Sequence, residues 1–223
     1  MEEALLLTEL KTIIEESKRR GIKVFVIGAF CVKAYDCLVR ESYDLDLAIH
    51  GESYAPLAEL LIELGYSVRP RDIWVTAEKQ SGDEQIAVHI AIDEILDLNS
   101  QNRYPVHDEE AVIRNLGPPN FEIPALSLSG LLTTKLISFR ENDIVDVVSI
   151  LMEKFNDLNP EEFYEKIVRS QNLAAIHRRL TDLLDLFERN EIDGIWYVRL
   201  RQALSNEMKA TVTSNIKKLL GLF

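Results

Sequence analysis

The stretch from Lys23 to Ile49, KVFVIGAFCVKAYDCLVRESYDLDLAI, constrains the fold more than any other part of the chain. A short apolar run stops at Gly28, and a helix is predicted over Phe30 to Val39. A second strand follows, in which Asp44 and Asp46 alternate with two leucines, so both carboxylates point to one side. Two like charges that close repel each other unless a cation lies between them, and Mg²⁺ with oxygen ligands is the usual occupant.

The same stretch resembles the nucleotidyltransferase superfamily that includes DNA polymerase beta, in its minimal and abortive-infection (toxin-like) branches. The resemblance implies an α+β fold, a mixed sheet flanked by helices, with Mg²⁺ held by the two aspartates and with NTP as substrate. The other interpretation is that the aspartates merely end a surface hairpin. Ala29 departs from the family pattern, which has a second small Gly or Ser there. The residues that carry the resemblance, and that it places at the metal and the nucleotide, are Gly28, Ala29, Arg40, Ser42, Asp44 and Asp46.

A third catalytic group is expected on the strand Gln85 to Ile92, which alternates strictly between apolar residues and other residues. The family usually carries a third carboxylate near the first two, as a general base or a further metal ligand. The mid-strand position here holds His89, and the nearest acid on that side of the strand is Asp93. His89 is a candidate base because its ordinary pKa lies near neutrality. The alternative is that His89 only fills space beside the sheet.

A second block, from Leu128 to Asp146, resembles the family pattern in which a helical lysine lies near the nucleotide phosphates. The matching lysine is Lys135, and the acids after it are Asp143 and Asp146. On a continuous helix, Lys135 and Asp146 share one face. The alternative is an ordinary helix surface with mixed charges. The resemblance covers roughly residues 23 to 155.

Beyond Leu158 the sequence changes character. Asn159-Pro160 is a strong helix start, and the remainder reads as a series of amphipathic helices. The brief run from Phe121 to Pro124 is expected to be an edge strand. We therefore predict a nucleotidyltransferase-like domain over 1–157 and a C-terminal helical bundle over 158–223.

The composition favours a cytoplasmic protein that does not bind long nucleic acids. The net charge is −12, which argues against broad contact with a phosphate backbone but not against a small nucleotide. Cys31 and Cys37 are predicted to be reduced and unpaired. The acidic amphipathic N-terminus is unlike a signal peptide, and no apolar run is long enough to span a membrane.

Three functions remain open from the sequence. The first is a Mg²⁺-dependent nucleotidyltransferase that moves an NMP to a hydroxyl of a tRNA, a protein or a small molecule. A toxin-like enzyme of a toxin–antitoxin pair is one form of this hypothesis. The second is a catalytically degenerate protein of the same fold that binds a nucleotide or a partner. The third is an antitoxin-type or scaffold protein that acts through its C-terminal helices as a homodimer.

Overall fold

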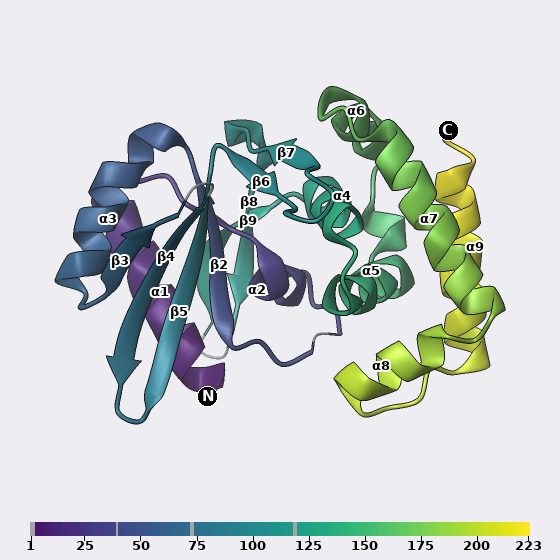
Figure 1. Ribbon diagram of the computed structural model, residues 1–223, viewed down its shortest axis with the longest axis horizontal. Helices are drawn as coiled ribbons and strands as arrows, with labels where there is room; N and C mark the ends of the chain where they lie inside the picture. The colour runs from purple at the N-terminus through teal and green to yellow at the C-terminus, as the bar shows by residue number, and fades with distance from the viewer. Residues whose placement is uncertain (1–2, 39, 72–73, 118–119) are drawn as a thin grey trace. The chain divides into compact units, whose positions relative to one another are not determined.

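The computed structural model describes residues 3–38, 40–71, 74–117 and 120–223. The chain forms two compact units. The first unit comprises Met1–Ala34, Glu41–Leu96 and Pro105–Ser127, and the second comprises Tyr35–Arg40, Asp97–Tyr104 and Leu128–Phe223. The fold is α+β, with a mixed sheet flanked by helices and followed by C-terminal helices, as the sequence predicts (Figure 1).

The first unit is built on a mixed sheet. Within the described residues the sheet has seven strands in the order β3-β4-β5-β2-β1-β9-β8 (Figure 1). The pairs β2/β5 and β1/β9 are parallel, and the other neighbours are antiparallel. The strands are β1 (Phe25–Val26), β2 (Asp44–Ile49), β3 (Ser67–Pro70), β4 (Trp74–Ser81), β5 (Glu84–Ile92), β8 (Ala111–Leu116) and β9 (Phe121–Leu126).

The helices of the first unit supply the rest of its core. Leucines and isoleucines recur at helical spacing in α1 (Glu3–Arg19), and this stripe is buried. Helix α1 packs against α3 (Tyr54–Glu63) and β2, while α3 also packs on β3. Helix α2 (Gly28–Ala34) connects β1 to β2. Short 3₁₀ turns, η1 (Gly51–Ser53) and η2 (Asp108–Glu110), precede α3 and β8 respectively.

Two sequence expectations for the first unit differ from the structure. The helix after β1 begins at Gly28 and ends at Ala34, because Asp36 adopts a left-handed backbone with φ of 54°. Val39, the expected end of that helix, lies outside the described residues. The expected edge strand, β9, is an interior strand between β1 and β8, so β8 forms the edge. Pro124 is tolerated inside β9 because β1 is short, spanning only Phe25–Val26. The pairing between β1 and β9 is made at Ala125 and not at Pro124.

The second unit is helical. Helices α7 and α9 pack side by side, and α4 packs against α5, α6 and α7 (Figure 1). No helix among the described residues is both long enough and apolar enough to cross a membrane. The helices are α4 (Leu128–Ser138), α5 (Glu141–Glu153), η3 (Phe155–Asp157), α6 (Pro160–Arg169), α7 (Leu173–Glu188), α8 (Ile192–Leu200) and α9 (Asn206–Leu220). Strand β6 (Glu94–Leu96), which belongs to the first unit, and strand β7 (Arg103–Pro105) precede these helices in the chain.

The division between the units differs from the boundary expected near Leu158. Helices α4 and α5 belong with the C-terminal helices, because α4 packs on α6 and α7 while α5 packs on α8 and α9. Nearly every residue of α4 is buried, so a single apolar stripe does not describe it. The change of sequence character at Asn159 marks the start of α6, which Asn159 caps with its side chain.

Candidate active site

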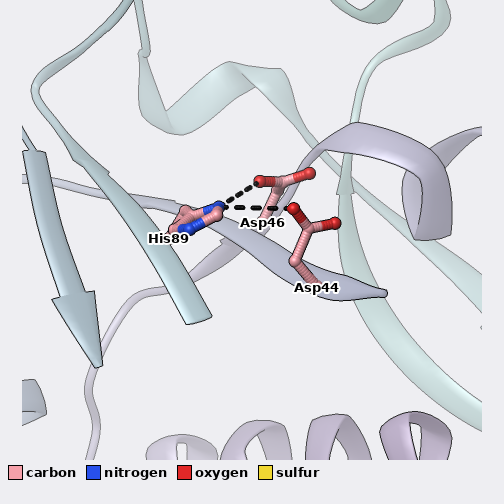
Figure 2. A group of neighbouring side chains, drawn as sticks. All are labelled: Asp44, Asp46 and His89. Atoms are coloured by element: carbon pink, nitrogen blue, oxygen red, sulfur yellow. Dashed lines mark ion pairs between the residues drawn. The ribbon is translucent and has the colours of Figure 1, made fainter. Parts of the chain in front are cut away.

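The candidate site is formed by Asp44, Asp46 and His89, all in the first unit (Figure 2). The Nδ1 atom of His89 lies 3.5 Å from Oδ2 of Asp44 and 3.6 Å from Oδ1 of Asp46. One nitrogen and one oxygen from each carboxylate all lie within 4.8 Å of one another. The three side chains are partly exposed, so a small ligand can reach them from solvent.

The sheet register holds these side chains together. Strand β2 runs parallel to β5 with Asp44 opposite Ala87 and Asp46 opposite His89. Leu45 and Leu47 point to the other face and are fully buried, which fixes the face that the aspartates occupy. Neighbouring strands lie about 4.8 Å apart, so side chains at paired positions of β2 and β5 are natural neighbours.

Gly28 leaves room for the carboxylate of Asp46. The φ angle of Gly28 is +66°, which favours glycine, and an added Cβ would lie 2.8 Å from the Cβ of Asp46 and overlap its Oδ2. The backbone before this glycine is also fixed to β2, because the N–H of Ile27 donates to the carbonyl of Asp46 at 3.0 Å. The turn that ends β1 therefore lies directly against the second aspartate.

Ser42 orients the first aspartate. Its hydroxyl lies 3.1 Å from Oδ1 of Asp44 and 3.3 Å from the Asp44 carbonyl, and the residue is buried. A hydroxyl in this position donates to the carboxylate and restricts its rotation. The Ser-x-Asp spacing of the motif thus places the serine hydroxyl where it can bond to the carboxylate two residues later.

The electrostatics of the site favour a cation. The pKa of His89 lies above its ordinary value, first because the Asp46 carboxylate accepts from the imidazole, and also because of the negative charges of Asp46, Asp44 and Glu78. These effects outweigh burial, which acts to lower the pKa of His89.

Glu78 is a residue near the site that the sequence analysis did not predict. The strand register reveals it, because β4 places Glu78 opposite Ala87, in the same row across the sheet as Asp44.

Comparison with solved structures finds the same architecture elsewhere. JHP933 from Helicobacter pylori matches 100% of this chain and 94% of its own, with 11% identity and a TM-score of 0.59. An antigenic nucleotidyltransferase-like protein from Paracoccidioides brasiliensis matches 90% of this chain and 95% of its own, with 14% identity and a TM-score of 0.57. ANT(2")-Ia, in complex with adenylyl-2"-tobramycin, matches 76% of this chain and 99% of its own, with 14% identity and a TM-score of 0.51. The chain has the nucleotidyltransferase fold.

Sequence comparison adds no nearer relative: no protein-family model and no curated protein matches the chain. The nucleotidyltransferase fold agrees with the family that the Gly28 to Asp46 motif resembles. At these sequence identities the structural likeness establishes the fold, and the activity must be argued from the site itself.

The structure does not bring Asp93 together with Asp44 and Asp46. Strand β5 ends at Ile92, and Asp93 adopts a left-handed backbone with φ of 61°. Its carboxylate accepts a hydrogen bond from the backbone N–H of Gly51 at 2.8 Å and lies 4.0 Å from His50. Asp93 therefore fixes the turn into α3, at the opposite end of β2 from Asp44. This placement corrects the expectation that it supplies the third carboxylate.

The other predicted nucleotide contacts occupy different settings. Ala29 is buried in the first turn of α2, and Arg40 is half-buried in the segment before β2. Lys135 is buried in α4, where its ammonium lies 2.6 Å from Asp146 and 3.2 Å from Asp143. These ion pairs join α4 to α5 inside the second unit. A role of Lys135 toward phosphates stays a prediction.

The donor set of the site fits a divalent cation. Two carboxylates from adjacent positions of one face converge, and carboxylate oxygens are the ligands that hard cations prefer. The carboxylates of Asp44 and Asp46 carry like charges and lie near each other, and the ion pairs described for them include no lysine or arginine. Asp44 and Asp46 are therefore suited to hold a metal, with His89 beside them.

Proposed function

We propose that this chain is a metal-dependent nucleotidyltransferase that moves a nucleoside monophosphate from an NTP to a hydroxyl of an acceptor. The observation that carries the proposal is the meeting of Asp44, Asp46 and His89 beside Gly28, on a nucleotidyltransferase fold. The order and spacing of the residues in the motif support it independently of the geometry.

The chain's own residues would prepare the site for the nucleotide. Asp44 and Asp46 would hold the divalent cation, Mg²⁺ in the sequence hypothesis. Such an ion, when bound, neutralises phosphate oxygens and lowers the pKa of an attacking hydroxyl. Ser42 restrains the carboxylate of Asp44, and Gly28 allows the carboxylate of Asp46 to lie against the turn.

The proposed reaction is a displacement at the α-phosphorus of the NTP. The acceptor oxygen bonds to that phosphorus while the bond to the oxygen that bridges the α- and β-phosphates breaks, and pyrophosphate leaves with the electron pair. The proton of the acceptor hydroxyl passes to water or to His89, the base that the sequence suggests. The turn at Gly28-Ala29 would contact the phosphates. Ser42 is a further predicted phosphate contact, besides its bond to Asp44.

The acceptor is proposed as a hydroxyl of a tRNA, a protein or a small molecule. The complex of ANT(2")-Ia with adenylyl-2"-tobramycin offers a precedent on this fold for the small-molecule class. The net charge of −12 also favours acceptors that lack a long phosphate backbone. A toxin-like role in the cytoplasm, as a homodimer, belongs to the same hypothesis.

The proposal is tested by calorimetric titration of Mg²⁺ together with each NTP, followed by incubation with α-labelled NTP. We expect the wild type to bind NTP only with metal, and D44N/D46N to lose this binding. The matched control is D83N, which removes an exposed carboxylate from the turn between β4 and β5. Failure of the wild type to bind any NTP in the presence of divalent metal would overturn the proposal.

A second candidate function is a catalytically degenerate protein of the same fold that binds a nucleotide or a partner. The distance of Asp93 from the site favours it, because no third carboxylate joins Asp44 and Asp46 among the grouped metal-binding side chains of the described residues. It predicts metal-dependent NTP binding without release of pyrophosphate in the presence of tRNA, protein or aminoglycoside acceptors. Release of pyrophosphate that depends on Asp44 excludes it.

A further inference from the structure

The imidazole of His89 faces both aspartates through a single nitrogen. In Figure 2 the two dashed lines start from the same ring nitrogen, Nδ1, and end on different carboxylates, at 3.5 and 3.6 Å. A side chain that merely filled space beside the sheet would not need to point its nitrogen at two carboxylates. A ligand that completes a metal site would do so, because all donors of such a site aim at one point.

The sheet fixes the three donors firmly. Asp44 is the first residue of β2, whereas Asp46 and His89 lie inside β2 and β5 and directly opposite each other. The two strands are paired from Asp44 to Ile49 of β2. Donors that rise from paired strands are held more precisely than donors on loops. The arrangement therefore offers one cation two oxygens and one nitrogen, and His89 is the member that departs from an all-oxygen set.

The identity of this third donor bears on the choice of metal. Mg²⁺ is a hard cation that takes oxygen ligands in near-octahedral geometry and keeps several waters. Imidazole nitrogen suits first-row transition ions such as Zn²⁺, Fe²⁺ and Ni²⁺ much better than it suits Mg²⁺. A site with two oxygens and one nitrogen should therefore discriminate between these two classes of cation.

We propose that His89 is a metal ligand through Nδ1, and that the site consequently prefers a divalent transition-metal ion to Mg²⁺. The inference rests on the proposed function for the presence of a metal at Asp44 and Asp46. It assigns His89 a role different from the general base that the sequence suggests, since a nitrogen bound to a metal cannot accept the proton of the attacking hydroxyl. It also changes the cation expected from the motif alone.

Mn²⁺ gives the most stringent test of the preference over Mg²⁺, because among the divalent first-row ions it has the lowest affinity for sites with nitrogen ligands. We would titrate the chain of residues 1–223 with Mn²⁺ in the absence of NTP, follow the free ion by electron paramagnetic resonance, and then add Mg²⁺ as a competitor. We expect bound Mn²⁺ to resist a tenfold excess of Mg²⁺. Pulsed measurement of the bound ion should detect coupling to a ¹⁴N nucleus.

Two variants make the test specific to the nitrogen. In H89A we expect Mn²⁺ affinity to fall by about tenfold or more, the size of effect seen when support of a metal ligand is lost, while Mg²⁺ affinity changes far less. In H89D, which offers three carboxylates, the ¹⁴N coupling should vanish and the preference should shift toward Mg²⁺. Circular dichroism checks that both variants fold, and His89 is half-exposed, so neither change leaves a buried cavity.

Two results would overturn the inference. One is bound Mn²⁺ without nitrogen coupling, and the other is tighter binding of both metals in H89A, which would mean that the imidazole competes with the cation for the carboxylates. Failure of the proposed function is a separate result. If Mn²⁺ binds with nitrogen coupling but the chain binds no NTP, the proposed function is contradicted and His89 remains a metal ligand. If NTP binds in a metal-dependent way but the bound Mn²⁺ shows no nitrogen coupling, the proposed function stands and the assignment of His89 is contradicted.

Discussion

At the scale of single residues, Gly28 is the position where a small change should have the largest effect. In G28A the added Cβ meets the carboxylate of Asp46, and the positive φ adds backbone strain of order 1–3 kcal/mol. We expect metal affinity to fall by at least about tenfold because Asp46 must move. G21A is the matched control: Gly21 has a φ of +70° and no atom within 4 Å of its added Cβ. Chemical unfolding and metal titration of both variants separate strain from displacement, and equal metal affinity in the two would contradict the assignment.

Ser42 should act on the metal through Asp44. Loss of its hydroxyl in S42A leaves the carboxylate free to rotate, so we expect metal affinity to decrease by about tenfold with the nucleotide absent. S53A is the control, because Ser53 is also buried and precedes α3 without a side-chain capping bond. If S42A impaired only NTP binding, and left metal binding unchanged, the hydroxyl would serve the phosphates and not Asp44.

The residue scale also shows how far sequence reasoning reaches. Alternation in β2 was enough to predict that Asp44 and Asp46 share a face, because that follows from strand geometry alone. The partner of Ser42 and the contact between Gly28 and Asp46 depend on the path of the chain between β1 and β2, which no periodicity encodes. The prediction for Asp93 fails for a similar reason: alternation predicts the side of a residue only while the strand continues, and β5 ends one residue before Asp93.

At the scale of elements, the junction of α4 and α5 depends on a buried cation. Lys135 pairs with Asp146, which is fully buried, and with Asp143. Replacement in K135M leaves a buried carboxylate without compensation, so we expect the free energy of unfolding to fall by about 3–5 kcal/mol. The control K11M breaks an exposed ion pair with Glu15 and should change stability by less than about 1 kcal/mol. Denaturant unfolding measures both, and unchanged stability in K135M with weaker NTP binding would support a role toward phosphates instead.

The same junction should respond to acid. Burial acts to raise the pKa of Asp143, but the positive charges of Lys135 and Arg140 outweigh it, so this pKa lies below its ordinary value. A carboxyl with a lowered folded pKa contributes fully above its unfolded pKa of about 3.9, and the contribution is lost as the pH falls through the folded pKa. We expect the unfolding free energy to decrease with pH below about 4, and less steeply in D143N. D185N, which removes an exposed carboxylate of α7, should keep the wild-type slope.

The elements themselves were largely predictable where one strong signal decides them. The cap at Asn159, followed by Pro160, predicted the start of α6 correctly. The strand at Phe121 was predicted, but its place inside the sheet was not, because the position of a strand depends on pairing partners far away in the sequence. Helix α2 ends early because of the backbone of Asp36, and a single aspartate is a weak stop signal.

At the scale of the whole molecule, the sequence located a change of character near Leu158 but not the division between the compact units. A change of pattern reports where amphipathic helices begin. It does not report that α4, nearly all of whose residues are buried, and α5 need those helices as cover. The net charge, by contrast, is a property of the sequence alone, and its consequences for acceptors follow without the fold.

The two divisions of the chain predict different behaviour for a fragment of residues 1–157. Without α6 to α9, the apolar side chains of α4 and α5 face solvent, at a cost of about 1.5–3 kcal/mol for each large side chain exposed. The fragment also loses the hydrogen bond from Asn215 in α9 to the carbonyl of Leu151 in α5, 2.8 Å long. We therefore expect it to aggregate on size-exclusion chromatography and to exchange the amide hydrogens of α4 and α5 much faster than the full chain. A fragment of residues 1–220 removes only the three residues after α9 and should behave like the full chain. A monomeric 1–157 fragment with protected α4 and α5 amides would instead support a domain boundary at Leu158, since those helices would then be stable without the bundle that follows them.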